Sequence, residues 1–432
     1  MKKIIVIGNS PAGVKACELI RQNDQSCDIT LFSLDGTYPS VRQLFPGLIG
    51  KSIKEDKALY HPVNFYKDNK INVILERKLS KINFKKKKVN TEEKDQLDYD
   101  VLLITSTGET QWPDIKGTAR IGVFALNGIT DVKNIMSHLS LTDTVLVQTN
   151  SVLGLQTAVS LQKQGKEVIL IIPSQWPLDQ LVDQQMAEII VHGLGERGLR
   201  MITDNSITEI LGDTETKAVR LKNGKVLATQ MVIFSDLGHG LKMFQNSELS
   251  LDQGIRVNEN FRTNVEDVYA LGEVACINNL PAGYGHLNLQ QLEREGLIVS
   301  RLITNQGNAL ESTITTTSFT LGDLSVHVLG QYRIDPDIKQ FLIEHPQEKT
   351  SPTNHSRKVF KKIFIKNDTL SQAVLINADQ DFEQCYQLIK NQSNINSFLD
   401  QNAVAVNWST EQNFVTNNIS DPLLDSSSAL NR

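Results

Sequence analysis

The sequence has few cysteines and no long apolar run, and these absences exclude several classes of protein. Only four of its 432 residues are cysteines, and no two of them have the close spacing of a metal-ligand set or a dithiol motif. No apolar run approaches the roughly 20 residues that cross a bilayer. We therefore expect no metal centre, no disulfide framework and no membrane span. With no signal peptide before the first strand, the cytoplasm is the simplest location. The four cysteines are Cys17, Cys27, Cys276 and Cys385.

The charge balance gives no reason to expect nucleic acid or an anionic membrane as a partner. Lysine and arginine number 44 against 49 acidic residues, a formal net charge of -5. No Ser/His/Asp or paired-carboxylate constellation appears, so the catalytic residues stay unassigned. The chain is too long for one ordinary core, and two or three domains are expected.

Two segments follow the same plan of strand, turn, amphipathic helix and strand. They are "KKIIVIGNSPAGVKACELIRQNDQSCDITLFS", from Lys2, and "VLVQTNSVLGLQTAVSLQKQGKEVILII", from Val145. Each is followed by short β-rich segments and a final buried strand, which predicts parallel sheets built from βαβ units. From about Ala309 the pattern becomes β-rich, with a single helix at 382–392. The fold class predicted is α/β, with two Rossmann-like domains and a small α+β C-terminal domain.

The first segment contains a turn that favours dinucleotide binding. In "GNSPAG", Gly8 and Gly13 hold the outer positions of a Gly-x-Gly-x-x-Gly fingerprint, and Ser10 replaces the middle glycine. The glycines allow the tight turn, the approach of backbone to a pyrophosphate, and the packing of helix on strand. The following helix presents free N–H groups to the phosphates. Ser10 is a mild change, because its hydroxyl can itself donate to a phosphate oxygen.

Four stretches occur in a recognisable order: "GNSPAG", Tyr38-Pro39 with "SVRQLFPGLIGK", "YDVLLITSTGETQWPDIKG" and "GIRVNENFRTNVEDVYALGEVA". In these four stretches and in their order, the chain resembles the FAD-dependent pyridine nucleotide–disulfide oxidoreductases. The resemblance is closest to the NADH:rubredoxin reductases and to the flavin portion of nitrite reductases. It covers roughly residues 1 to 395, and an ordered set is more specific than any one motif.

The resemblance implies where the domains begin and end. An FAD-binding domain would comprise residues 1–112 and 243–310, with an NAD(P)H-binding-like domain inserted at 113–242. A small C-terminal domain would span 311–400. The remaining stretch, 401–432, is polar and rich in Asn and Ser, and we expect it to be a disordered tail.

The resemblance also implies FAD as a cofactor and a set of residues around it. Residues 8–13 would wrap the pyrophosphate, and Ser33 stands where a ribose-binding glutamate is usual. Arg42 would lie at the basic position beside the isoalloxazine, and Glu273 replaces an aspartate that holds the ribityl chain. Residues 105–107 replace an Ala-Thr-Gly that passes close to the flavin. The implied cofactor-binding residues are Gly8, Ser10, Pro11, Ala12, Gly13, Ser33, Arg42, Thr105, Ser106, Thr107, Gly272 and Glu273.

Departures from the family pattern are mild in the FAD half, apart from the β-branched Thr107 in place of a glycine. They are severe in the NAD(P)H half. Thr149 and Ser151 replace the first two glycines of the second turn, and Asp236 stands where anionic phosphates would bind. The strand ending "ILIIPS" supplies no acid for a ribose and no arginine for a phosphate. We interpret this half as a retained scaffold in which NAD(P)H binding is impaired.

Three hypotheses follow. The first is an FAD-dependent oxidoreductase that passes electrons to a protein or metal-centre acceptor, with a redox partner protein as reductant if the nicotinamide site is inactive. The second is a non-catalytic structural or regulatory subunit that keeps the family fold. The third is an enzyme with another adenine nucleotide in the first turn. A homo- or hetero-oligomer is compatible with each, and the fold does not choose among them.

Overall fold

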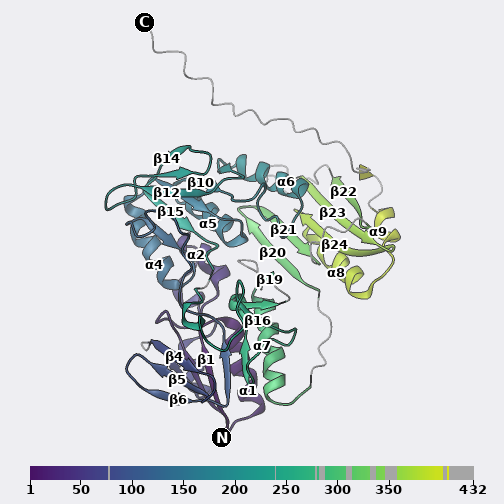
Figure 1. The fold of residues 1–432 in the computed structure, drawn as a ribbon. Coiled ribbons are helices and arrows are strands. Elements are labelled where there is room, and N and C mark those ends of the chain that lie inside the picture. Colours follow the sequence, from purple (N-terminus) through teal and green to yellow (C-terminus); the bar gives the residue numbers. More distant parts are fainter. Residues whose placement is uncertain are drawn as a thin grey trace.

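The computed structural model has two five-stranded parallel sheets with flanking helices, one six-stranded antiparallel sheet, and three small three-stranded sheets among the described residues (Figure 1). It describes residues 1–75, 78–238, 240–277, 280–281, 288–307, 314–330, 337–345, 358–401 and 406–407. The fold class predicted from the sequence is therefore confirmed. Most of the predicted tail, residues 402–405 and 408–432, lies outside the described residues.

The first parallel sheet has the strand order β17-β7-β1-β2-β3. Its central strand is an uninterrupted apolar run that is buried on both faces, as in parallel sheets covered by helices. The helices α1 and α7 pack against each other beside it, and a Cβ at Gly296 of α7 would lie 2.5 Å from the carbonyl of Ala12. These elements are β1 (Lys3–Ile7), β2 (Asp28–Phe32), β3 (Ile71–Ile74), β7 (Val101–Ile104), β17 (Val268–Ala270), α1 (Pro11–Asn23) and α7 (Leu289–Ile303).

The second parallel sheet repeats this plan, with the order β11-β10-β9-β15-β8. The unit β9-α5-β10 corresponds to β1-α1-β2, so the two turns occupy equivalent places at the carboxyl ends of central strands. Ligands bind at this edge of an open α/β sheet. Its elements are β8 (Val123–Ala125), β9 (Thr144–Gln148), β10 (Glu167–Ile171), β11 (Arg200–Ile202), β15 (Met231–Phe234) and α5 (Val152–Lys163).

Smaller elements connect the strands of both sheets. Each parallel sheet has a three-stranded antiparallel insertion before its last sequential strands, β4-β5-β6 in the first and β12-β13-β14 in the second, and β16-β18-β19 forms a further small sheet. Among the described residues, no helix is long and apolar enough to cross a membrane. The strands are β4 (Leu79–Asn83), β5 (Lys88–Thr91), β6 (Gln96–Asp98), β12 (Ile207–Leu211), β13 (Ala218–Leu221), β14 (Val226–Ala228), β16 (Ile255–Val257), β18 (Ala275–Ile277) and β19 (Leu280–Pro281). The helices are α2 (Phe45–Ile49), α3 (Val63–Asp68), α4 (Ile129–His138) and α6 (Gln184–Gly195).

The third sheet is antiparallel, with the order β20-β21-β24-β23-β22-β25, and α8 (Phe382–Asn391) packs on it. The expectation of a single helix in this region is wrong, because a second short helix, α9 (Asn396–Gln401), follows α8. The cap of α8 at Gln392 has a left-handed backbone, which ends one helix and allows the next. The strands are β20 (Thr316–Leu321), β21 (Leu324–Leu329), β22 (Lys339–His345), β23 (Val359–Lys366), β24 (Thr369–Ile376) and β25 (Val406–Asn407).

A buried ion pair joins the third sheet to the second. Lys362 of β23 pairs with Asp183, the N-cap residue of α6, and donates to Gln185 at 2.9 Å. The side chains of Lys362 and Asp183 are only 7% and 13% exposed. Phe319 and Leu324 of the third sheet share an apolar core with Leu155 of α5, and so the pair lies beside a continuous hydrophobic contact.

We expect Lys362→Ala to destabilise the protein strongly. It leaves the carboxylate of Asp183 buried without its cation, a change that costs about 3–5 kcal/mol. Lys358→Ala is the matched control, because Lys358 pairs with Glu344 on the surface, with side chains 65% and 42% exposed, and such pairs contribute about 1 kcal/mol or less. Urea and thermal unfolding measure the loss of stability in both variants. Equal losses in the two variants would refute the structural role of the buried pair.

Candidate functional site

The first turn has the geometry of a phosphate-binding turn. Gly8 has φ +97°, and a Cβ on it would lie 2.4 Å from the backbone nitrogen of Ser106. A Cβ on Gly13 would lie 2.8 Å from Cγ2 of Thr105. Ser10 caps α1, and its hydroxyl oxygen accepts from the N–H of Ala12 at 3.3 Å. The hydroxyl proton of Ser10 can still be donated, so the substitution at the middle glycine keeps a donor in the turn.

The structure places the predicted ribose-binding residue differently from the expectation. Ser33 is 1% exposed, and its hydroxyl donates to Asp35 at 2.9 Å and to the carbonyl of Thr37 at 2.6 Å. Asp35 instead lines the cavity in front of the turn, and Asn9 donates to it at 2.8 Å. The hydrogen bonds that Asp35 accepts from Asn9, Ser33 and Thr37 all end on Oδ1, and its Oδ2 lies toward Gly128. Asp35, two residues beyond Ser33, is therefore the carboxylate that faces the cavity.

The segment after β7 accommodates its threonines without blocking the turn. Thr105 donates to the carbonyl of Ile7 at 3.1 Å, and Thr105 and Ser106 line the cavity. Thr107 is 7% exposed and is absent from the cavity lining. Its hydroxyl bonds the backbone of Glu109, while Gly108 takes the positive φ of +64°. The β-branched residue is therefore directed away from the place where a ligand would approach.

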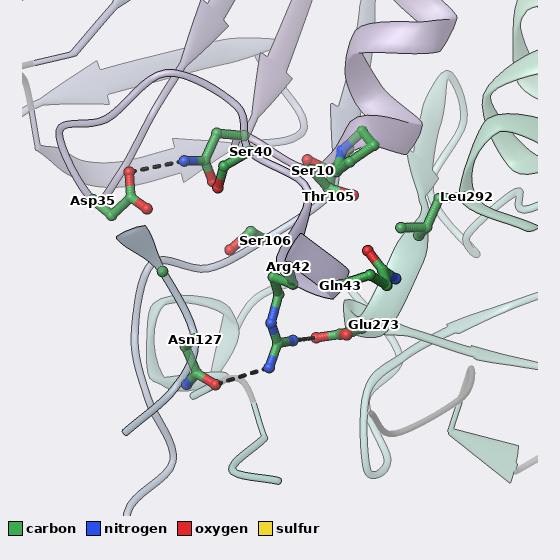
Figure 2. Close-up of a pocket in the computed structure, with 13 residues that line it drawn as sticks. Ser10, Asp35, Ser40, Arg42, Gln43, Thr105, Ser106, Asn127, Glu273 and Leu292 are labelled. Carbon is green, nitrogen blue, oxygen red and sulfur yellow. Dashed lines mark hydrogen bonds and ion pairs between the residues drawn. The ribbon is translucent and has the colours of Figure 1, made fainter. Parts of the chain in front are cut away.

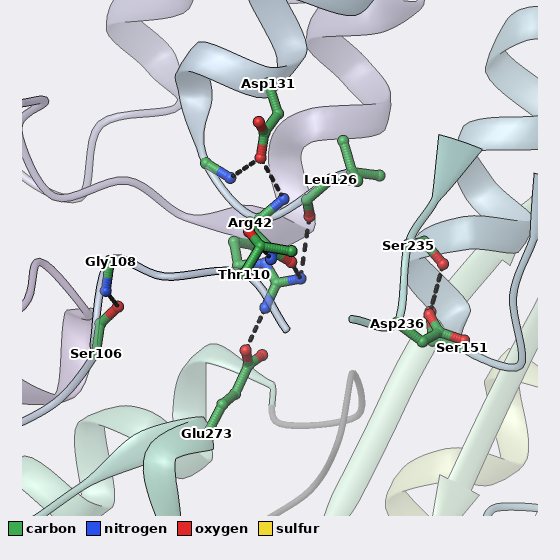
Figure 3. A network of polar contacts seen from close by, with 12 residues as sticks. Arg42, Ser106, Gly108, Thr110, Leu126, Asp131, Ser151, Ser235, Asp236 and Glu273 are labelled. Atoms are coloured by element: carbon green, nitrogen blue, oxygen red, sulfur yellow. Dashed lines mark hydrogen bonds and ion pairs between the residues drawn. The ribbon is translucent and has the colours of Figure 1, made fainter. Parts of the chain in front are cut away.

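Arg42 and Glu273 form an ion pair across the site (Figure 2). The guanidinium also donates to the carbonyl of Leu126 at 3.0 Å and to Oδ1 of Asn127 at 3.4 Å (Figure 3). Its Nε is buried with no hydrogen-bond partner. Arg42 thus joins the segment after β2, the turn after β17 and the segment that precedes α4.

Two cavities meet at this ion pair. The first, of about 60 Å³, lies in front of the α1 turn, and the second, of about 210 Å³, lies between the N-termini of α5 and α7 and strand β20. Arg42, Gln43 and Glu273 line both of them. The other residues of the first cavity are Asn9, Ser10, Pro11, Asp35, Ser40, Thr105, Ser106, Asn127, Gly128 and Leu292. The other residues of the second are Val152, Leu153, Gln156, Asn288, Thr317, Ser318 and Phe319.

Of the predicted residues, Ser10, Pro11, Arg42, Thr105, Ser106 and Glu273 line the first cavity. Gly8, Ala12, Gly13 and Gly272 shape the backbone around it, while Ser33 and Thr107 lie outside its lining.

A buried carboxyl group lies beneath this site and was not predicted from the sequence. Glu295 of α7 is 7% exposed and accepts from the N–H of Gly272 at 2.5 Å. Burial raises the pKa of Glu295 to about 7; the hydrogen bond from Gly272 opposes the shift and the neighbouring Glu273 adds to it. The residue therefore titrates near neutral pH, directly behind the Gly272–Glu273 turn.

In the second turn, a carboxylate of the chain itself occupies the turn just before α5 (Figure 3). Asp236, just after β15, accepts from the N–H of Asn150 and from the hydroxyls of Thr149, Ser151 and Ser235. The distances from Thr149 Oγ1 to both carboxylate oxygens are 3.2 Å. The residues that replace the two missing glycines are thus hydrogen-bond donors to Asp236.

The remaining glycine of this turn stays for a steric reason. A Cβ on Gly154 would lie 2.1 Å from Oγ1 of Thr149 and 2.4 Å from Oγ of Ser235. A second acid is also nearby, since the side chain of Asn150 donates to Asp179 at 2.6 Å and accepts from the N–H of Leu178 at 2.8 Å. Two carboxylates therefore stand where a pyrophosphate would need positive or neutral donors.

The chain belongs to the pyridine nucleotide-disulphide oxidoreductase family, whose model matches residues 2–295. The resemblance stated from the motifs is therefore confirmed. Relatives in this family are NAD(P)H-dependent flavin oxidoreductases. The four cysteines of this chain are free and buried, so none presents a thiol to either cavity.

Three similar proteins illustrate the range of the family. The NAD(P)H nitrite reductase of Bacillus subtilis is 20% identical over 400 residues, which cover 91% of this chain and 48% of the relative. The rubredoxin-NAD(+) reductase of Ectopseudomonas oleovorans is 24% identical over 282 residues, 64% of this chain and 72% of the relative. The solved covalent putidaredoxin reductase–putidaredoxin complex superimposes with a TM-score of 0.76 at 16% identity, over 90% of this chain and 93% of that chain. The chain thus spans about half the length of the nitrite reductase that it matches.

We expect Glu295 to make stability fall as pH rises. A carboxyl whose pKa is raised on folding contributes stability that is fully present below its unfolded value, 4.5, and is lost as pH rises through about 7. The loss is on the order of 3 kcal/mol, and Glu295→Gln should abolish it while it keeps the acceptor for Gly272. Urea unfolding from about pH 4 to about pH 8 measures the slope. Glu259→Gln, an exposed carboxyl, is the control, and parallel curves for wild type and Glu295→Gln would contradict the assignment.

Proposed function

We propose that this chain is an FAD-dependent flavoprotein oxidoreductase that receives electrons from a redox partner protein instead of NAD(P)H. The contrast between its two turns carries the proposal. In front of the first turn lies a cavity lined by the carboxylate of Asp35 and by the hydroxyl-bearing Ser10 and Ser106. In the second, Asp236 already holds the donors that a pyrophosphate would need. One of the two sites is left for an anionic cofactor.

The residues of the first site fit FAD. Gly8 and Gly13 leave no room for side chains, so the backbone of the turn can approach a pyrophosphate. Asp35 supplies the carboxylate that a ribose hydroxyl needs as an acceptor. The second cavity, with Leu153 and Phe319 in its wall, suits a planar ring. The ion pair of Arg42 and Glu273 stands between the two cavities, so it has to part when a cofactor fills both.

Bound FAD would supply the redox chemistry, and the protein would supply binding, orientation and electrostatics. The N-terminus of α7, capped by Asn288, borders the second cavity, and its dipole favours negative charge there. Arg42 adds a positive charge on the other side. Both groups would therefore stabilise an electron-rich ring.

NAD(P)H does not fit the second turn. A pyrophosphate would have to displace the carboxylate of Asp236 from four donors, with Asp179 close by. Like charges at this distance repel, and the desolvation of the site would not be recovered. We therefore derive no hydride transfer through this half.

A non-catalytic subunit is the second candidate, and one observation favours it. The first cavity is only about 60 Å³, and the Arg42–Glu273 ion pair closes its connection to the second. A chain that had lost its cofactor would gain stability from such a pair. This candidate predicts a colourless protein that takes up no flavin.

Two of the similar proteins support the proposal of a redox partner protein. One is named for its action on rubredoxin, and the other was solved as a complex with putidaredoxin. We propose the cytoplasm as the location, and a homo- or hetero-oligomer is compatible with the proposal.

The first test is a visible absorption spectrum of the purified chain under anaerobic conditions. We expect the yellow flavin bands, no bleaching on addition of NADH or NADPH, and full bleaching with dithionite. Rapid bleaching by NADH would refute the proposed reductant, and a protein that stays colourless after refolding with FAD would refute the flavin.

The second test is Asp236→Gly, which removes the internal anion and leaves its donors free. We expect inorganic phosphate to raise the Tm of this variant and to leave the Tm of the wild type unchanged. We also expect the variant to bind NADH about tenfold or more tightly, because a loss of about 1.4 kcal/mol of repulsion corresponds to a tenfold change in affinity. Calorimetric titration measures the affinity. Asp213→Gly is the control, because Asp213 is 95% exposed between β12 and β13 and lies outside the donor set. Unchanged responses in Asp236→Gly would show that the carboxylate does not exclude the ligand.

A further inference from the structure

Glu295 of α7 is a buried acid that no cation accompanies. It is 7% exposed and accepts from the N–H of Gly272 at 2.5 Å. In the part of the chain that the structure describes, no lysine, arginine or histidine forms an ion pair with it. Leu292, one helical turn earlier on α7, lines the first cavity (Figure 2). A carboxylate buried without a cation is costly, so burial favours the neutral acid.

The packing of α7 on α1 holds Glu295 next to the first turn. Gly296, the following residue, has no side chain, and a Cβ on it would lie 2.5 Å from the carbonyl oxygen of Ala12. On the other side of the hydrogen bond, a Cβ on Gly272 would lie 3.3 Å from Oγ of Ser10, which caps α1. A single hydrogen bond therefore joins Glu295 to the backbone that approaches the turn.

The electrostatic surroundings of Glu295 are negative. Glu273, which follows Gly272, raises the pKa of Glu295 further, although Glu273 is itself paired with Arg42. The other acids around α1, α7 and the first cavity have hydrogen-bond or ion-pair partners of their own. They are Glu18 with Lys15 at 3.0 Å and His61 at 3.7 Å, Glu293 with Tyr60 at 2.8 Å, and Asp35 with Asn9 at 2.8 Å. A further negative charge at the first turn would therefore act on a carboxyl group that no paired cation compensates.

We propose that Glu295 takes up a proton from solvent when an anionic cofactor binds at the first turn, and returns this proton when the cofactor leaves. The inference rests on the proposed function, which assigns the negatively charged pyrophosphate of FAD to this turn. Like charges repel, and protonation of Glu295 removes one of them. The neutral acid keeps an acceptor oxygen for the N–H of Gly272, so the turn keeps its support.

The direction of the pH dependence follows from the pKa of Glu295. Burial raises this pKa to about 7 in the unliganded chain, and a bound anion raises it further. Below about pH 6 the group is neutral in both states, so the affinity for FAD does not change with pH. Above about pH 7 binding brings in a proton, and the affinity falls by up to about tenfold per pH unit. The site therefore releases its cofactor more readily as pH rises.

Calorimetry counts the proton directly. The full chain, freed of flavin, is titrated with FAD at about pH 7.5 in two buffers of different ionisation enthalpy, and the difference in heat gives the protons taken up per FAD. We expect about half a proton or more for the wild type and none for Glu295→Gln. Quenching of flavin fluorescence gives the affinity from about pH 6 to about pH 8.5, where we expect an approximately tenfold fall for the wild type and a flat profile for the variant.

Glu293→Gln is the matched control. It removes a carboxylate from the same helix, two residues earlier, and glutamine still offers an acceptor to the hydroxyl of Tyr60. We expect this variant to take up the same number of protons as the wild type and to show the same fall in affinity. An infrared difference spectrum of the wild type, which should gain the band of a neutral carboxylic acid on FAD binding, decides the question if Glu295→Gln does not fold.

The proposal is overturned if the wild type takes up no proton, if Glu295→Gln takes up as many as the wild type, or if the infrared band does not appear. Failure of the proposed function gives a different result, namely a chain that binds no FAD. ADP-ribose, which carries the same adenosine and pyrophosphate groups, then replaces FAD in the same titrations. Proton uptake with ADP-ribose that Glu295→Gln abolishes supports the coupling without the flavin, whereas no uptake, or no binding of either ligand, refutes it.

Discussion

The rest of this structure depends on one requirement, that the N-terminus of a helix after a parallel strand needs a negative partner. The first N–H groups of such a helix have no acceptor within it, and the helix dipole adds partial positive charge. Both halves of the chain contain this arrangement, after β1 and after β9. In the first half Ser10 caps α1 and a cavity lies in front of the turn, and in the second Ser151 caps α5 and Asp236 accepts from the N–H of Asn150, one residue before the cap. The same arrangement is therefore open to the proposed ligand in the first half, and the chain itself satisfies it in the second.

The substitutions in the second turn form a coupled set. Thr149 and Ser151 each remove a glycine, and each brings a hydroxyl that bonds Asp236. Ser235 adds a third hydroxyl, and the crowding of Thr149 and Ser235 is what still requires glycine at position 154. Any one of these residues alone would disturb the turn, because a hydroxyl there would lack a partner or the carboxylate would lack its donors. Together they satisfy one another without a ligand.

Much of the fold was predictable, because apolar strands that alternate with amphipathic helices are a local sequence pattern, and this pattern is typical of parallel sheets. The site was predictable only in part. Asp35 replaces Ser33 at the cavity since the loop after β2 turns the later side chain toward it, and a turn of this kind is not visible in residue types. Thr107 looked obstructive because the pattern did not show that its hydroxyl would bond Glu109.

Arg42 connects these features. It pairs with Glu273 across the mouth of two cavities and bonds the segment that leads into α4, while its own chain continues into α2. A molecule that entered either cavity would meet this ion pair, because Arg42 and Glu273 line both. Coupling between two sites needs an element whose arrangement differs with each ligand. A single guanidinium with a partner on each side is the simplest such element here, because breaking one of its contacts leaves a charge on a side chain only 19% exposed, which then needs another partner.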